Sequence, residues 1–472
     1  MFRFRSILSI SVFIVCATVA GCRATNQLGS ITQSGNSSVA LAITDTPPSL
    51  VTILSAEVTL TGAAFTPGNV PLFSGSTTVE LTRLQTDIAY LTTATNVPSG
   101  SYTGVTLTFA NPKLTIENDT GATIGTCLNG TICPITPVAA NLSTTVTIPT
   151  LPIAANSVNG LLIDVSLDNL LSATLGADFK NGAAVSSFTP AGTNAPVVGA
   201  EDVVGQVASV DATHDTFTLQ NAAASYSLAV DSSTFFFPFP STVCTTASFA
   251  CLKANQILSV DIGIRADGTP VARNILFEDA DNSDTEVEGM ITSTNVGLAQ
   301  FTMVTLGESA AVSGLQIGDV ATVQYVATPQ TTFDIDFTHA DSKPVITTCC
   351  IFGGPVDLSV GQQVSILRNS ASSTNTVVAD RVRLRSSRIT ANVGSLGSPN
   401  IYLTTIPSIF SGHGVTQIQA LTSSSSTIYY EIGSTIISSD VDLGDLVSVR
   451  GPFFNVSGTR ILVASKVVLK KP

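Results

Sequence analysis

Four copies of one short segment in the C-terminal half constrain the fold of this chain more than any other feature. Each copy runs apolar-x-apolar, then a Gly or Asn, then an Asp or Gln, and then a short alternating stretch. The copies occupy residues 252–260, 315–323, 358–366 and 441–449. An Ala-x-x-apolar-x-apolar stretch follows 20 to 23 residues after the start of the first, third and fourth copies, at 272–277, 379–384 and 464–469. Two signals at matching offsets predict repeated structural modules.

The turn residue of each copy indicates its backbone conformation. Gly318, Gly361 and Gly444 fit a position that needs a positive φ or a close backbone approach. Asn255 tolerates the same region. We expect three β modules, at 201–280, 285–386 and 387–472. The copy at 315–323 departs from the pattern, so the second module is either one enlarged unit or two degenerate ones.

The N-terminal half predicts a separate β domain at 37–180, followed by a linker at 181–200. Residues alternate between apolar and polar at 38–43, 53–60, 105–109 and 161–167, which is typical of half-buried strands. The turn before Tyr102 predicts that its ring is buried at the start of a strand. Charged residues make up only 11% of the chain, and the abundant Thr, Ser, Val and Ile favour strands over helices. The expected fold class is therefore all-β.

Two resemblances refine this expectation. The stretches "LAITDTPPS", "VELTRL" and "VPSGSYTGVTLTF" resemble the bacterial family called domain of unknown function 4382 (DUF4382). That resemblance implies an exported domain with an immunoglobulin-like or prealbumin-like sandwich fold and no established activity. The repeated modules resemble a second family, domain of unknown function 5666 (DUF5666). That resemblance implies small β-barrels of five or six strands, close to the OB-fold in outline.

The first 22 residues predict export and lipidation. Arg3 and Arg5 precede an apolar run at 7–20 that is short for a membrane span. Val19-Ala20-Gly21-Cys22 resembles the lipobox of bacterial lipoproteins. The resemblance implies removal of the signal peptide 1–21, acylation of Cys22 with chains such as palmitate, a tether at 22–36 and membrane anchoring by lipid. Arg23, rather than Asp, after the cysteine favours the outer membrane. The alternative is an ordinary secretory signal with an incidental cysteine.

The charge balance argues against nucleic acid as a partner. The formal net charge is −13, and it becomes −15 once the signal removes Arg3 and Arg5. Nucleic-acid binding needs a basic groove with stacking aromatic residues. Surface platforms for sugars usually rely on Trp or Tyr, and this chain has no Trp and only seven Tyr.

Six cysteines remain after Cys16 leaves with the signal and Cys22 is acylated, and they are candidates for disulfides in an exported protein. They fall in three neighbouring pairs, Cys127 with Cys133, Cys244 with Cys251, and Cys349 with Cys350. The first two pairs would each close a short loop. The adjacent pair could form a vicinal disulfide with a redox role, but two buried or separately paired thiols are favoured.

Few residues suggest catalysis or metal binding. His214, His339 and His413 lie in no recognised motif, and we expect all three in exposed loops. The acidic stretch 278–286 resembles a calcium loop but fails the EF-hand template, so a solvated linker is favoured. If calcium binds there, its ligands would be Asp279, Asp281 and Asp284. No other metal or cofactor is expected.

Two further groups of residues, one of phenylalanines and one of aspartates, could serve either as part of a binding site or as structural elements. The phenylalanines of 235–239 could form an exposed ligand site, but packing into a barrel core is favoured. Asp45 and Asp164 could be polar site residues, although Asp45 is expected to cap the turn before Pro47.

The sequence therefore predicts a lipid-anchored protein of the bacterial envelope, with a sandwich nearest the membrane and a row of small β modules after it. The expected role is non-enzymatic, a structural or binding function in contact with envelope polysaccharide or protein. One alternative is a hydrolase or redox protein that uses Cys349 and Cys350 or a composite site. The other is an adhesion protein stiffened by calcium.

Overall fold

A computed structural model describes residues 37–470, except for 47–51, 173, 189–198, 222–224, 266, 280–285, 309–313, 327–329, 337–348, 370–371, 374–375, 424–426 and 432–433. The predicted signal peptide, Cys22 and the tether lie outside the described residues. Within those residues, no helix has the length and apolar character needed to cross a membrane. The protein is mostly β, and the described part contains no helix of seven or more residues.

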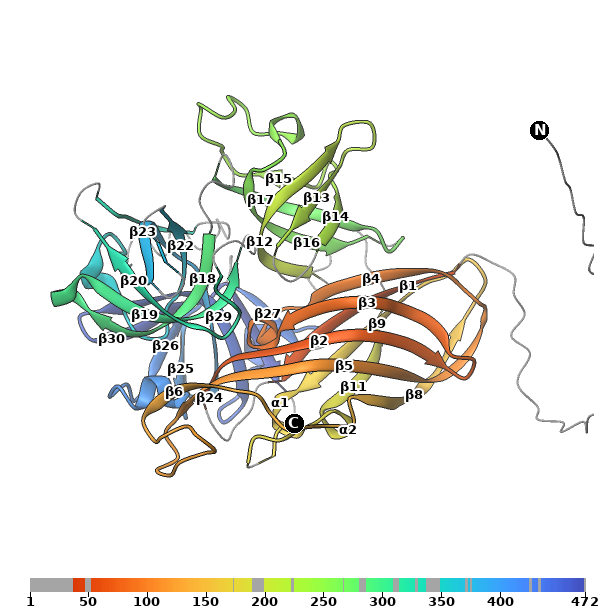
Figure 1. The fold of residues 1–472 in the computed structure, drawn as a ribbon, viewed down its shortest axis with the longest axis horizontal. Helices are drawn as coiled ribbons and strands as arrows, with labels where there is room; N and C mark the ends of the chain where they lie inside the picture. Colours follow the sequence, from red (N-terminus) through yellow and green to blue (C-terminus); the bar gives the residue numbers. More distant parts are fainter. Residues whose placement is uncertain are drawn as a thin grey trace, which may run out of the picture.

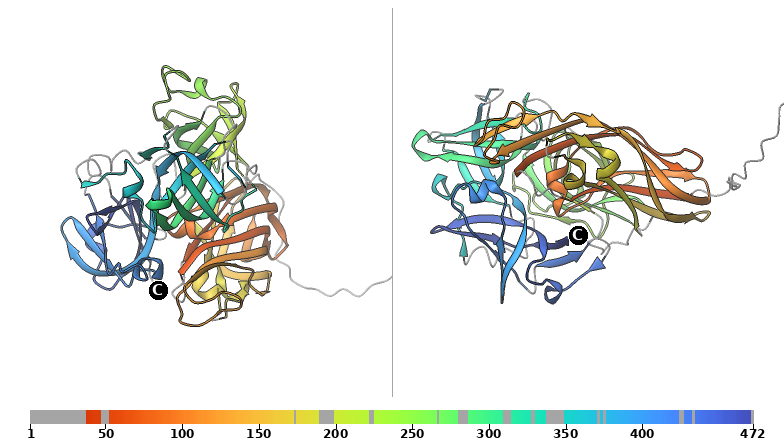
Figure 2. Two further views of the ribbon diagram at one scale, coloured as in Figure 1. Left: turned by 60° about the vertical axis from the view of Figure 1, so that its left-hand side comes forward. Right: turned by 90° about the horizontal axis from the view of Figure 1, so that it is seen from below.

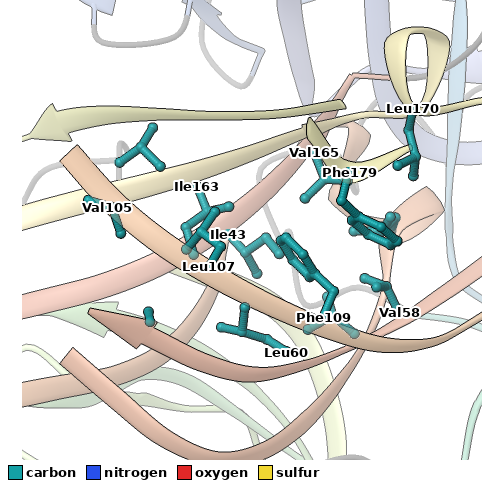
Figure 3. Close-up of a cluster of buried hydrophobic side chains, with 14 of the residues drawn as sticks. Ile43, Val58, Leu60, Val105, Leu107, Phe109, Ile163, Val165, Leu170 and Phe179 are labelled. Carbon is teal, nitrogen blue, oxygen red and sulfur yellow. The ribbon is translucent and has the colours of Figure 1, made fainter. Parts of the chain in front are cut away.

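The N-terminal domain consists of two sheets that enclose one hydrophobic core (Figures 1 and 3). One sheet has the order β11-β9-β1-β4, and the other has the order β3-β2-β5-β6 with β8 also paired to β5. The strands are β1 (Ser37–Thr46), β2 (Thr52–Thr66), β3 (Val70–Glu80), β4 (Ala89–Val97), β5 (Gly100–Asn118), β6 (Thr131–Ile135), β7 (Ala139–Ala140), β8 (Ser143–Ile153), β9 (Val158–Ser166), β10 (Ala177–Asp178) and β11 (Ala183–Phe188). The short helices are η1 (Leu81–Gln85), α1 (Leu167–Leu170) and α2 (Phe179–Gly182). We call this domain the sandwich.

The sandwich core follows from the alternation in the sequence. Leu107 and Phe109 on β5 face Ile163 and Val165 on β9 across the space between the sheets, as Figure 3 shows. Tyr102 is 1% exposed, which confirms the prediction of a buried ring, and its hydroxyl donates to the Pro98 carbonyl at 2.8 Å. The predicted linker at 181–200 is too long, because β11 lies inside it and pairs with β9.

The remaining strands form three modules with one topology. Modules 1 (199–279) and 2 (286–384) each contain a closed five-stranded barrel, and module 3 (386–470) contains a third ring of strands, consistent with OB-like modules. In each module the first strand pairs with the second and with the strand that follows the repeated turn. A parallel pairing then closes the ring: β14 with β17, β20 with β23, and β26 with β30.

The bounds of the module strands are as follows. Module 1 contains β12 (Gly199–Asp211), β13 (Thr216–Gln220), β14 (Ser225–Ala229), β15 (Phe235–Phe236), η2 (Phe249–Cys251), β16 (Ile257–Ile264) and β17 (Pro270–Asp279). Module 2 contains β18 (Glu286–Asn295), η3 (Val296–Leu298), β19 (Gln300–Glu308), β20 (Val320–Tyr325), β21 (Thr332–Ile335), η5 (Pro355–Asp357), β22 (Gln363–Arg368) and β23 (Thr376–Leu384). Module 3 contains β24 (Ser386–Gly397), β25 (Asn400–Thr404), α4 (Ser408–Ser411), β26 (Ile418–Leu421), β27 (Ile428–Glu431), β28 (Ser434–Thr435), η6 (Ser438–Asp440), β29 (Leu446–Val456), β30 (Thr459–Val463) and β31 (Lys466–Lys470).

The repeated segment forms the same turn in all four copies. Its turn residue has a positive φ in each, which confirms the prediction: 74° at Asn255, 87° at Gly318, 87° at Gly361 and 88° at Gly444. The Asp or Gln that follows caps the turn by accepting a hydrogen bond from the backbone N–H three residues earlier. The distances are 2.8 Å at Gln256, 2.8 Å at Asp319, 2.7 Å at Gln362 and 2.7 Å at Asp445. The motif therefore encodes a capped turn that starts a strand.

The divergent copy has a structural explanation. Three copies lead into the equivalent strands β16, β22 and β29, whereas the copy at 315–323 leads into β20, earlier in its module. All six strands of 286–384 nevertheless belong to one sheet. The extra copy thus reuses the same turn at a second hairpin.

The modules pack around the sandwich rather than forming a row (Figures 1 and 2). Phe454 and Ile461 of module 3 belong to the buried cluster of module 2. Leu54 of the sandwich belongs to the core of module 3. Thr93 and Thr115 of the sandwich donate to the turn carbonyls of Gly268 in module 1 and Gly318 in module 2, at 2.6 and 2.7 Å. The expectation of a row of modules is wrong. Apolar residues of one part are buried in the core of another, and polar residues form hydrogen bonds between the parts.

Candidate binding cleft

A buried carboxylate fixes the sandwich against module 3. Asp87 follows η1, and its side chain is 3% exposed. Arg388 of β24 donates to Asp87 at 2.6 and 2.8 Å, while Lys466 of β31 lies at 3.3 Å and Arg450 of β29 at 3.9 Å. Burial alone would raise the pKa of Asp87, but the three neighbouring cations hold it well below its ordinary value. We call this cluster the sandwich junction.

A second ionic cluster joins module 1 to module 2. Glu278 at the end of β17 is paired with Arg381 at 2.9 Å, with Arg385 at 3.0 Å and with Arg383, all from module 2. Glu286 at the start of β18 pairs with Arg381 at 3.1 Å. Burial and the charge of Glu286 raise the pKa of Glu278 to about 7, against the opposing effect of the arginines. We call this cluster the module junction.

The module junction corrects the interpretation of the acidic stretch 278–286. Its two ends, Glu278 and Glu286, are buried in ion pairs with arginines instead of lying in a solvated linker. Of the calcium candidates, Asp279 is the last residue of β17, and Asp281 and Asp284 lie outside the described residues. Among the residues that the structure describes, no group of three or more His, Cys, Asp or Glu could hold a metal ion.

A cleft of about 340 Å³ lies where the sandwich, module 2 and module 3 meet, and Arg388 of the sandwich junction lines it. The sandwich contributes the start of β2, η1 and the first turn of α1. Module 2 contributes β18, β19 and β22, and module 3 contributes β24, the segment 405–410, which includes most of α4, and the start of β29. No single module could form this cleft.

Uncharged polar side chains dominate the polar part of the cleft. The Thr390 hydroxyl donates to Gln85 Oε1 at 3.1 Å, and Arg388 donates to Gln363 Oε1 at 3.0 Å. Asn392 Nδ2 donates to the Gly444 carbonyl at 3.1 Å. These bonds hold the amides in place and leave Gln85 Nε2, Gln363 Nε2 and Asn392 Oδ1 without a partner among the described residues. Preorganised amides of this kind can bind the hydroxyl groups of a ligand.

Apolar side chains form the rest of the wall. They are Ile53, Leu54, Met290, Leu306, Ala391, Ile406, Pro407, Ile409, Phe410 and Leu446. The described lining contains no His, Cys, Lys or Tyr, and its one carboxylate is Asp168. Nucleophile–base pairs that use Cys, His or Lys are therefore absent from the described lining.

The cysteines form three disulfides away from this cleft. The bonds join Cys127 to Cys133, Cys244 to Cys251, and Cys349 to Cys350. The third pair corrects the favoured expectation of separate thiols, since it is a vicinal disulfide. Cys350 is 7% exposed and belongs to the core of module 2.

The two histidines that the structure describes, His214 and His413, lie in different modules. His214 is exposed and pairs with Asp211 at 2.7 Å, and His413 is exposed just after α4. His339 lies outside the described residues.

The predicted core and turn residues have mixed outcomes. Phe239 packs in the core of module 1 as predicted, but Phe235 is 55% exposed, so the run 235–239 is only partly a core element. Asp45 is fully buried, and burial raises its pKa well above the ordinary value against the charge of Lys470, with Asp164 adding to the rise. Lys470 Nζ donates to the Asp45 carbonyl at 3.1 Å, a second contact between the sandwich and module 3.

Sequence reasoning missed the residues that build the cleft. Arg388 and Asp87 are 301 positions apart, and neither belongs to a motif. The module junction had one weak signal in the sequence, because Arg381, Arg383 and Arg385 occupy alternate positions in a chain with few charged residues. Such spacing places three guanidiniums on one face of a strand.

Comparison with known proteins gives no identification. No protein-family model matches the chain, and no curated protein is significantly similar to it. A search of solved structures gives a multidomain protein with nucleic acid binding domains from Streptococcus pneumoniae TIGR4. It is 10% identical, with 58% of this chain and 74% of that chain covered, at a TM-score of 0.11. A TM-score this low carries no argument about fold or function.

Proposed function

We propose that this protein is a non-enzymatic binding protein of the bacterial envelope, and that the three-part cleft holds a neutral, hydroxyl-rich ligand such as a stretch of envelope polysaccharide. The observation that carries the proposal is the set of fixed amides with unused hydrogen-bonding groups, beside an apolar wall and with no His, Cys or Lys in the described lining. Hydroxyls of a sugar match the amides, and its apolar face matches the wall.

The proposed anchor is the acylated Cys22, with the sandwich joined to the outer membrane through the tether 22–36. In this proposal the sandwich belongs to the DUF4382 type, with an immunoglobulin-like or prealbumin-like arrangement, and the modules belong to the DUF5666 type. The support is the motif pattern in the sequence, together with two sheets around one core and three strand rings of equal topology.

The test uses the full mature chain with Cys22→Ser, which stays unacylated. Isothermal titration with neutral tetrasaccharides, chitotetraose and maltotetraose, and with purified neutral envelope polysaccharide is expected to give saturable binding. Gln85→Ala should weaken binding about fivefold to tenfold, the loss expected for one hydrogen bond. Leu446→Trp, which places a large ring at the cleft wall, should abolish binding.

The matched control is Gln220→Ala, which removes the same side chain from an exposed position on β13 of module 1. It should bind like the parent chain. The proposal fails if no neutral saccharide binds, or if Gln85→Ala and Gln220→Ala behave alike. Turnover of a substrate that Cys349→Ser abolishes would instead favour the redox alternative.

A further inference from the structure

A second hollow lies on module 3 and is separate from the cleft. Its volume is about 440 Å³, and its walls come from β25, the segment 413–417 after α4, β26, the turn between β29 and β30, and the first two residues of β30. Its polar lining comprises Tyr402, His413, Thr416, Gln417, Gln419, Thr459 and Arg460. No acidic residue occurs in the described lining, although acidic residues outnumber basic ones in the chain by 33 to 20.

Arg460 is the unusual member of this hollow. Its Nε and Nη1 atoms are buried without a hydrogen-bond partner, and it takes part in no ion pair within the described part of the chain. By contrast, Arg265 of module 1 pairs with Asp231 at 2.8 Å, and Arg383 pairs with Asp334 at 2.9 Å. Burial lowers the pKa of Arg460, with no carboxylate to oppose the effect.

An unsatisfied guanidinium costs stability, because burial removes water without supplying another acceptor. A ligand that supplies an acceptor would satisfy such a group, and a guanidinium fits a carboxylate with two parallel hydrogen bonds. The neighbouring groups indicate the rest of the ligand. Gln417 and Gln419 offer amides, and Thr416 and Thr459 offer hydroxyls.

His413 has a defined role in this lining. Its Nδ1 lies 2.9 Å from the Ile409 carbonyl, so Nδ1 carries the proton and donates. Nε2 of the neutral ring is then an acceptor for a hydroxyl group. No carboxylate among the described residues acts on the pKa of Arg460, which burial alone lowers.

We propose that this hollow binds an acidic sugar, with the ligand carboxylate on Arg460 and the sugar hydroxyls on the surrounding amide and hydroxyl side chains. The site goes beyond the neutral cleft and does not depend on it. The segment 408–417 contributes to both cavities, with Ser408, Ile409 and Phe410 in the cleft and His413 to Gln417 in the hollow.

The binding test compares three probes on the full mature chain with Cys22→Ser: trigalacturonic acid, neutral maltotriose and inorganic phosphate. Trigalacturonic acid should bind at least about tenfold more tightly than either other probe, because it alone offers both carboxylate and hydroxyls. Arg460→Gln should remove this advantage. Arg460→Lys should retain only part of it, since the ammonium group lacks the planar fork.

Two controls make the result decisive. Arg273→Gln removes a half-buried arginine from module 1, whose Nη1 donates to Ser233 at 2.8 Å, and should leave trigalacturonic acid binding unchanged. Gln85→Ala should also leave it unchanged, which separates this site from the cleft. Equal binding of phosphate and trigalacturonic acid, or no effect of Arg460→Gln, overturns the proposal.

The melting temperature gives an independent readout. A guanidinium kept for a ligand lowers the stability of the empty protein, so Arg460→Gln should raise the melting temperature or leave it unchanged. Addition of trigalacturonic acid should raise the melting temperature of the parent chain and not that of the variant. A lower melting temperature in Arg460→Gln, with sugar binding intact, would assign Arg460 a structural role and overturn the proposal.

Discussion

The sandwich junction and the module junction both pair buried basic side chains with carboxylates, but they differ in how many carboxylates take part. Both bury three basic side chains where two parts of the molecule meet. In the sandwich junction, Arg388, Arg450 and Lys466 surround one carboxylate, Asp87. In the module junction, Glu278 is supported by Glu286, Glu288, Asp334 and Asp336.

This difference determines how each junction responds to the loss of one carboxylate. Removing one partner of a buried ion pair is costly mainly because the other charge stays buried without compensation. Without Glu278, Arg381 keeps Glu286, and Arg383 keeps Asp334. Asp87, by contrast, is the negative charge that acts most strongly on both Arg450 and Lys466. The sandwich junction should therefore be the more fragile.

The largest expected effect is that of Asp87→Asn. The substitution keeps the shape of the side chain but leaves three buried cations without their central charge. We expect a loss of about 3–5 kcal/mol in the free energy of unfolding, measured by chemical denaturation with separate probes for the sandwich and module 3. Because the pKa of Asp87 is lowered in the folded chain, its contribution is present above its ordinary value of 3.8 and disappears as the pH falls below it.

Asp442→Asn is the matched control, because Asp442 is exposed in the repeated turn of module 3. It should change the free energy of unfolding by less than about 0.5 kcal/mol. An equal effect of the two substitutions would show that the cations do not depend on Asp87, and the proposed fragility would be wrong.

A smaller effect is expected for Glu278→Gln in the module junction. The amide still accepts a hydrogen bond, and each of the three arginines keeps another carboxylate, so the loss should be about 1–3 kcal/mol. The same denaturation experiment measures it beside Asp87→Asn. If Glu278→Gln proves the more damaging of the two, redundancy is not what distinguishes the junctions.

Local patterns predicted the strands and turns well. Gly361 and Asn255 were predicted to have positive φ because a turn must precede each alternating strand, and both do. Tyr102 was predicted to be buried because it follows a turn and begins an apolar face. Such features depend on neighbours in sequence, which is why they can be derived from the sequence alone.

Long-range contacts could not be predicted in this way. Asp87 looked like any surface aspartate, because its partners are hundreds of residues away and no spacing connects them. The cleft could not be predicted for the same reason, since Gln85 and Thr390 meet only after the modules pack against the sandwich. The linker prediction failed at β11 because "AAVSSF" is short and weakly apolar, and its pairing with β9 decides its structure.

The smallest expected effect concerns the sign of a pH dependence at Glu117 in the sandwich. Glu117 lies half-buried on β5, between β2 and β6. Burial, together with the negative charge of Asp119, raises its pKa from 4.5 to about 7, although the charge of His413 acts in the opposite direction. Asp87, surrounded by cations, has its pKa lowered instead, so the two carboxylates should give opposite trends with pH.

The sign follows from proton binding. Between pH 4.5 and 7 the folded chain holds the Glu117 proton more tightly than the unfolded chain does, so this stabilising contribution is complete below pH 4.5 and is lost as the pH rises through 7. Glu117→Gln should therefore melt at a higher temperature than the parent chain at pH 8, with the difference shrinking toward pH 4.5. Solvent at this half-exposed site keeps the effect small.

Asp119→Asn should move the transition of Glu117 to lower pH, because it removes the neighbouring negative charge. The contradicting result would be a constant difference in melting temperature between Glu117→Gln and the parent chain from pH 4.5 to 8. Glu117 would then titrate like an exposed carboxylate, and burial at this edge of the sandwich would be too shallow to raise its pKa.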